Sequence, residues 1–146
     1  MLEALRPVYR SDAVFRADFA EKSIKTTQTR NAKLVRYILR RLEHQAGGTD
    51  FDVDAPAYTI EHVLPQSPDS GWDAFSDRDL ESFIYRIANM VMLEAGANRS
   101  AANRPYAEKR PALAGSAILL TRRSAEQNDE WNPTRLAARQ HRTRSG

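Results

Sequence analysis

Apolar residues recur along the chain at two different spacings, which predict a helical fold around a small sheet. Over residues 30–45 they fall three or four positions apart, the period of an amphipathic helix, with the basic residues between them on its solvated side. Thr29 or Asn31 could cap this helix, and the glycines at 47–48 end it. Residues 58–64 and 89–95 are short apolar runs that we expect to pair as strands.

Capping and stop signals mark the remaining helices. Ser76 and Asp79 form an S-x-x-D start signal, and Asn132 precedes a proline that could open the last helix. Pro105 suits the first turn of a short helix, which Pro111 should end. Besides 30–45, the expected helical segments are 12–24, 77–88, 98–103, 105–110, 116–127 and 133–142. The predicted fold class is α+β, mainly α.

Length and composition fit one domain in a reducing compartment. A chain of 146 residues can bury a single core, and no apolar run approaches the 18 residues of a membrane-spanning helix. The chain contains no cysteine, which excludes disulfides, thiolate nucleophiles and cysteine-ligated zinc. We expect a cytoplasmic protein without a membrane partner.

Charge is distributed unevenly along the chain. Residues 1–98 contain 12 basic and 15 acidic side chains, whereas residues 99–146 contain 10 basic and 4 acidic ones. A basic final third is typical of proteins that bind a polyanion such as DNA. A solvated surface with an arginine-rich tail would have the same composition, so charge alone leaves both interpretations open.

Four polar residues occupy the boundaries of the predicted strands and helices. Glu61 and His62 lie near the end of the first strand, in "YTIEHVLPQ" (58–66). Asn89 begins the second strand, and Asn98 follows nine residues later at the start of a helical turn. Taken singly, each has an ordinary structural explanation, because histidines near strand ends and asparagines in turns are often hydrogen-bonded or capping residues.

The order of these residues resembles the ββα-metal, or HNH, nuclease motif. More closely, the chain is similar to the C-terminal nuclease domain of GmrSD-type, modification-dependent restriction proteins over roughly residues 33–140. The matching pieces are "IEHVLPQ" (60–66), Trp72, "ANMVMLEAGAN" (88–98), "NRPYAEK" (103–109), Ser116, Trp131, Leu136 and Arg139. Ala88 replaces the usual glycine and Met90 the usual leucine, which are mild changes within a strand.

The resemblance implies an architecture and an activity. It implies a single HNH-like domain over 1–146, with N-terminal helices (1–48), a ββα-metal core (about 58–110) and C-terminal helices (111–146). The implied activity is metal-dependent endonuclease cleavage or nicking of DNA by an anti-phage restriction protein. We expect this chain to be the C-terminal part of a longer protein, with an NTP-binding, modification-sensing domain outside it.

The resemblance and phosphodiester chemistry assign roles to the motif residues. His62 is the candidate general base, because a neutral imidazole can take a proton from water near pH 7. Asn98 is the candidate ligand for Mg²⁺ or Mn²⁺, with Glu61 as a possible second ligand. By resemblance, Asn89 holds the loop that carries His62. Successive strand residues point to opposite faces, so Glu61 and His62 can both face a phosphate only if the strand twists or ends there.

A second group of residues could contact the nucleic acid. Lys109 could meet a phosphate or be a solvated helix lysine, and Arg99, Arg104 and Arg110 would extend a phosphate-binding surface. Asn103 could be a further metal-side ligand or cap the helix that follows, and we favour the cap.

Other functions remain open at this stage. The basic final third could belong to a non-catalytic DNA-binding module, in which the Glu-His pair is structural. A metal-phosphate site does not read the sugar, so the residues do not exclude an RNA-cleaving nuclease. A helical interaction domain using residues 30–45 is a further alternative.

Overall fold

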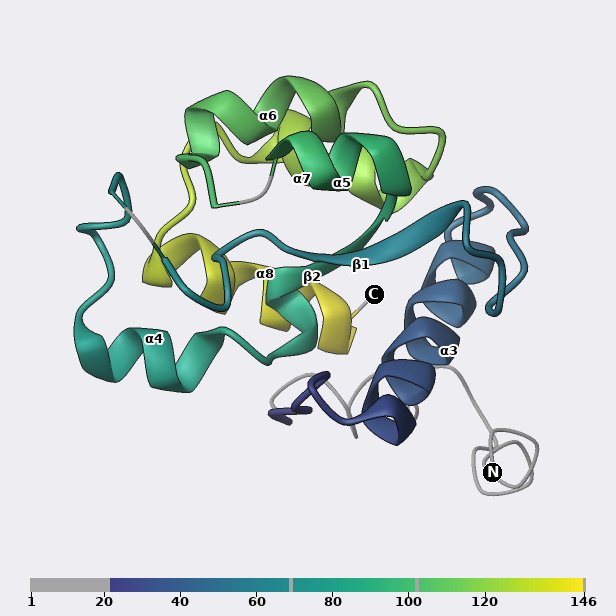
Figure 1. Cartoon of the computed structure of the whole chain (residues 1–146), viewed down its shortest axis with the longest axis horizontal. Coiled ribbons are helices and arrows are strands. Elements are labelled where there is room, and N and C mark those ends of the chain that lie inside the picture. The colour runs from purple at the N-terminus through teal and green to yellow at the C-terminus, as the bar shows by residue number, and fades with distance from the viewer. Residues whose placement is uncertain (1–21, 69, 102, 146) are drawn as a thin grey trace.

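A computed structural model describes residues 22–68, 70–101 and 103–145, and within them the fold is α+β and mainly helical (Figure 1). The elements are α3 (Thr29–Gln45), β1 (Tyr58–His62), α4 (Asp77–Phe83), a 3-10 turn η2 (Ile87–Asn89), β2 (Met90–Glu94), α5 (Ala95–Ala101), α6 (Tyr106–Ala114), α7 (Leu119–Gln127) and α8 (Pro133–Ser145). The predicted fold class is confirmed at this level. Most of the helix expected at 12–24 lies outside the described residues.

Strands β1 and β2 form an antiparallel pair in the middle of the molecule (Figure 1). Met90 and Met92 join the apolar cluster on the side of α3, whereas Val91 and Leu93 join a second cluster with residues of α4, α6 and α8. Both faces of the sheet are therefore buried, which explains why β2 is a continuous apolar run. α5 begins directly after β2, whereas α4 and η2 lie between the two strands along the chain.

Helix α3 buries its apolar stripe and uses two of its basic residues to hold the acidic segment that follows. Arg36 donates to the backbone carbonyls of Ala55 (2.8 Å) and Tyr58 (2.7 Å), and Arg40 donates to that of Phe51 (2.9 Å). The expectation that the basic residues of this helix form only a solvated side is wrong for these two. These hydrogen bonds fix the segment that leads into β1.

A buried carboxylate joins α3 to α7. Glu43 is fully buried and accepts hydrogen bonds from the backbone N–H groups of Thr49 (2.8 Å), Leu119 (2.7 Å) and Leu120 (2.9 Å). It satisfies two of the otherwise unpaired N–H groups at the start of α7. A side chain at Gly48 would bring its Cβ within 2.2 Å of this carboxylate, so the glycine is required by close approach.

Helix boundaries follow the predicted signals in some places and depart from them in others. The capping box of Ser76 and Asp79 is present, and the Asn132 side chain caps α8 as expected. α3 begins after Gln28 without a side-chain cap, so the predicted caps at its start are wrong. α6 continues through Pro111 to Ala114 because its packing against α7 outweighs the hydrogen bond lost at proline.

Within the described residues, no helix combines the length and apolar character needed to cross a bilayer.

Candidate functional site

A pocket of about 290 Å³ lies where β1 ends. Four of the predicted site residues line it, namely Glu61, His62, Asn98 and Asn103, together with Ile60, Pro65, Gln66 and Ser67. The fold brings them together because β2 runs back along β1 and places α5 beside the first strand. A second pocket of about 330 Å³ has a largely apolar lining from α3, β2 and α7, and includes none of the predicted site residues.

His62 is a largely buried imidazole with one hydrogen-bond partner among the described residues. Only 7% of the residue is exposed, its Nε2 lies 2.8 Å from the Thr26 hydroxyl, and its ring meets the edge of Tyr85 at 5.7 Å between centroids. Burial, and then the positive charge of Lys109, lower the pKa of His62 to about 4. The ring is therefore neutral near pH 7, the form that can accept a proton.

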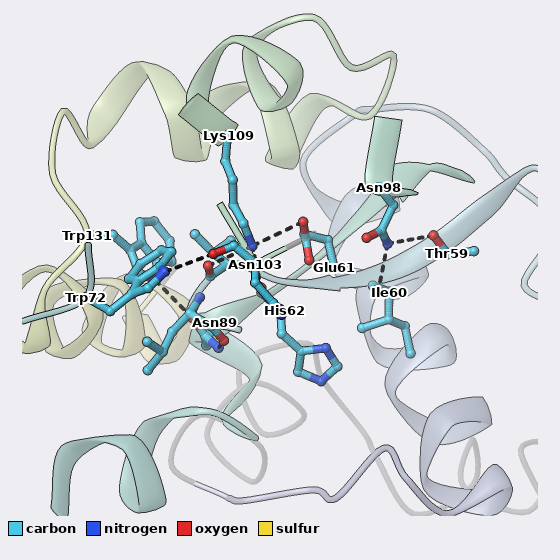
Figure 2. Close-up of polar contacts among 12 residues, drawn as sticks. Thr59, Ile60, Glu61, His62, Trp72, Asn89, Asn98, Asn103, Lys109 and Trp131 are labelled. Carbon is cyan, nitrogen blue, oxygen red and sulfur yellow. Dashed lines mark hydrogen bonds and ion pairs between the residues drawn. The ribbon is translucent and has the colours of Figure 1, made fainter. Parts of the chain in front are cut away.

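Glu61 points to the opposite side of β1 from His62, toward α6 (Figure 2). Its Oε2 lies 3.4 Å from Lys109 Nζ, a long contact that leaves this buried oxygen without a well-aligned hydrogen bond. Burial raises the pKa of Glu61 to about 7, although Lys109 opposes this shift. The strand is regular through His62, so the two side chains alternate as strand geometry requires.

The Asn98 amide is oriented by β1. Its Nδ2 donates to the Thr59 hydroxyl (2.7 Å) and to the Ile60 carbonyl (3.1 Å), which leaves the amide oxygen without a partner among the described residues (Figure 2). One amide oxygen and the incompletely paired oxygen of Glu61 fit a hard cation such as Mg²⁺, which binds few protein groups and keeps its waters. The described residues contain no cluster of three or more histidine, cysteine or acidic side chains that could hold a metal.

Asn89 fixes the backbone immediately after His62 (Figure 2). The residue is fully buried, and its Oδ1 accepts from the Leu64 N–H (2.8 Å) and the Trp131 indole N–H (3.0 Å). Its Nδ2 donates to the carbonyls of Leu64 and Ile84, both at 2.9 Å. With all four hydrogen bonds made inside the protein, this amide cannot serve as a metal ligand without losing one of them.

Lys109 lies inside the domain. Its Nζ donates to the carbonyls of His62 and Val63, both at 3.1 Å, lies beside Glu61, and sits 5.7 Å from the centroid of the Trp72 ring. The residue is fully buried, and burial lowers the pKa of its ammonium group. Its contact with a phosphate stays a prediction, one that this position does not favour.

The predicted arginines occupy different environments. Arg99 and Arg104 are exposed near the pocket-lining residues of α5 and the loop after it, whereas Arg110 is half-buried and donates to the Ala125 carbonyl at 2.9 Å. Arg110 therefore joins α6 to α7, and contacts of all three arginines with nucleic acid remain predictions.

Asn103 does not cap α6. The N-cap position is Pro105, and no side chain accepts a hydrogen bond there, so the favoured interpretation of Asn103 is wrong. The helix starts too late in the chain for the asparagine to reach its first N–H groups. Asn103 is exposed and lines the pocket, while its backbone carbonyl accepts a long hydrogen bond from Trp72 at 3.5 Å.

Two contacts at the site were not expected from the sequence. Thr26 lies in the polar stretch "KTTQT" (25–29), which has no pattern that indicates a contact with His62. Trp131 matches the restriction-protein pattern without any expected contact, but its indole N–H donates to Asn89. The late tryptophan of the restriction-protein pattern was the one available signal for this second contact.

Comparison with known proteins identifies the family. The family model described as the C-terminal domain of GmrSD restriction endonucleases matches residues 9–143. No curated protein matches the chain. The match covers nearly the whole chain, and it includes the pocket-lining residues and the two asparagines of the proposed motif. This chain belongs to the C-terminal domain family of the GmrSD restriction endonucleases.

Proposed function

We propose that this domain is a metal-dependent phosphodiester hydrolase that nicks or cleaves DNA. The observation that carries the proposal is the pocket at the end of β1, whose lining includes Glu61, His62 and Asn98, a neutral imidazole and hard oxygen donors. Glu61 and His62 point to opposite sides of β1, so the proposed reaction requires the end of the strand to twist until both face the phosphate. Membership in a restriction endonuclease family supports nuclease chemistry. β1 and β2 pair directly and α5 follows β2 at once, which supports an HNH-type ββα-metal core with α4 and η2 inserted between its strands.

In the proposed reaction, His62 takes a proton from the water that attacks phosphorus. Glu61 and Asn98 would hold a Mg²⁺ or Mn²⁺ ion, which when bound neutralises charge on the phosphate and the leaving oxygen. Asn89 positions the backbone after His62 through its two hydrogen bonds to Leu64. The exposed side chains of Arg99 and Arg104 are available to contact neighbouring phosphates.

The biological role proposed for this chemistry is restriction of phage DNA. The partner would be an NTP-binding domain that senses the DNA modification, outside this chain. The pocket described here contains no phosphate-binding glycine loop, which is consistent with nucleotide binding elsewhere.

A plasmid assay on His62→Ala tests the proposal. Supercoiled plasmid is incubated with the wild-type domain in Mg²⁺, Mn²⁺ or EDTA, and nicked and linear products are followed on a gel. Loss of a general base should reduce the rate by about 10²- to 10⁴-fold, while a gel-shift assay should show unchanged DNA affinity. His44→Ala is the matched control because this histidine is exposed at the end of α3 and lies outside the pocket.

The other outcomes of this assay would contradict the proposed mechanism or indicate a different function. Cleavage that persists in EDTA or in His62→Ala would overturn the proposed mechanism. DNA binding without cleavage by the wild type would indicate a non-catalytic binding module. Cleavage of structured RNA in preference to plasmid would identify an RNA nuclease built on the same metal-phosphate chemistry.

A further inference from the structure

We infer that Thr26 is a positioning residue that orients His62 for catalysis, an inference that rests on the proposed function. Thr26 lies before α3, outside the strand–strand–helix unit, and 36 positions before the histidine. Its hydroxyl oxygen is 2.8 Å from His62 Nε2, a good hydrogen-bond distance. The candidate base is thus held by a segment that the nuclease motif does not include.

The segment that carries Thr26 is anchored independently of this hydrogen bond. The Ile24 N–H donates to the Tyr85 carbonyl at 2.8 Å, and Ser23 forms an isolated antiparallel bridge with Arg86. Ile24 is itself buried in the apolar cluster beside α3. Substitution of the Thr26 hydroxyl should therefore leave the segment in place.

The contact engages one nitrogen of the ring and leaves the other available. Nδ1 makes no hydrogen bond to the described residues, and the ring also makes a T-shaped contact with the ring of Tyr85. A neutral imidazole carries one proton, so a hydroxyl that accepts from Nε2–H keeps the lone pair on Nδ1. When water gives its proton to Nδ1, Nε2–H still donates to Thr26, and the hydroxyl stabilises the ring in both protonation states.

Without this hydroxyl, the orientation of the ring would depend on packing alone. An aromatic edge contact limits the ring position but does not distinguish its two nitrogens. The ring could then adopt the other tautomer or rotate, and a smaller fraction of molecules would present a basic nitrogen to water. The expected consequence is a lower kcat with an unchanged KM for DNA, because Thr26 does not line the pocket.

The test compares Thr26→Val with Thr26→Ser. Valine keeps the shape but removes the hydroxyl, so kcat for plasmid nicking should fall about five- to tenfold, the effect of one hydrogen bond. Serine keeps the hydroxyl and should restore kcat to within about twofold of wild type. The ring ¹⁵N shifts of His62, measured by NMR at neutral pH, should move in the valine variant but not in the serine variant.

Thr27→Val is the matched control, because Thr27 is the exposed neighbour on the same segment. Wild-type kcat and ring shifts in Thr26→Val would overturn the inference, and so would a loss of kcat without a change in the ring shifts, since that would be a purely structural effect. If the wild-type domain cut no plasmid, the proposed function and the catalytic role of Thr26 would both fail. The ring shifts would then still show whether the hydrogen bond exists.

Discussion

At the scale of single residues, burial acts on two adjacent side chains in opposite directions. It lowers the pKa of His62 to about 4 and raises that of Glu61 to about 7, because burial disfavours the charged form of each. The sequence places both residues at a strand end. The fold decides that their side chains point to opposite sides of β1 and that the Glu61 carboxylate is the one beside the Lys109 ammonium group. Thr26 could not be predicted, because a threonine in a polar stretch gives no indication of a partner 36 residues away.

The lowered pKa of His62 predicts a specific pH dependence of stability. Below about pH 6.5 the unfolded chain takes up a proton at this histidine, whereas the folded protein does so only near pH 4. Stability from this group is therefore complete above pH 6.5 and is lost as the pH falls toward 4. Relative to wild type, the free energy of unfolding of His62→Gln should rise by about 2 kcal/mol between pH 7 and pH 5.

Urea unfolding at the two pH values measures this difference. Glu61 is present in both proteins, so its opposite contribution cancels in the comparison. His44→Gln serves as the control because its side chain is exposed on α3. An equal change in wild type and His62→Gln would show that the folded protein protonates this ring as readily as the unfolded chain does.

At the scale of elements, the end of β1 is held from two sides by groups that come later in the chain. Lys109 on α6 binds the carbonyls of His62 and Val63, and Asn89 before β2 binds the backbone of Leu64. The apolar pattern predicted the strand pair, but Asn89, expected as the first residue of the second strand, lies in η2 just before β2. The inward direction of Lys109 was not predictable, because helical periodicity does not distinguish a buried ammonium from a solvated one.

Removal of Lys109 should show that it and Glu61 stabilise the domain as a pair. Lys109→Met leaves a buried carboxylate without its cation, so the free energy of unfolding should fall by about 3–5 kcal/mol. Lys109→Met combined with Glu61→Gln removes both charges and should be more stable than the single Lys109→Met variant. Chemical denaturation of wild type, both single variants and the double variant gives the coupling energy.

Additive effects in this cycle would mean that the two groups act independently, in which case the 3.4 Å contact contributes little. Lys33→Met on α3 measures the cost of losing a lysine side chain at an exposed position.

At the scale of the whole molecule, the sheet has helices on both sides, and polar side chains join the layers. The long amphipathic helix α3, the strand pair, the capping box and the last helix followed from the sequence because local spacing and capping encode them. The continuation of α6 past Pro111 did not follow, because the packing of α6 against α7 decided it. The absence of an Asn103 cap did not follow either, because α6 begins too far along the chain from Asn103. The hydrogen bonds between Glu43 and α7 could not be predicted from the sequence either, because the partners of the carboxylate are backbone N–H groups about 76 residues away.

Glu43→Ala should weaken the whole domain. It removes the acceptor of three backbone N–H groups, so the free energy of unfolding should fall by at least about 3 kcal/mol. Glu126→Ala on α7 is the matched control because that side chain is exposed. Both are measured by urea unfolding, and equal effects of the two substitutions would show that the buried carboxylate is not required to join α3 and α7.

The hydrogen bond from Trp131 to Asn89 has a consequence for when the site becomes competent. A ribosome that has translated as far as α6 has already made every residue proposed to bind metal, water or phosphate. The indole that completes the bonding of Asn89, and the Arg139 side chain that binds the neighbouring Ala88 carbonyl, are still missing at that point. An incomplete nascent chain, or one clipped by a protease before Trp131, would thus carry all the proposed chemical groups without the support that aligns them.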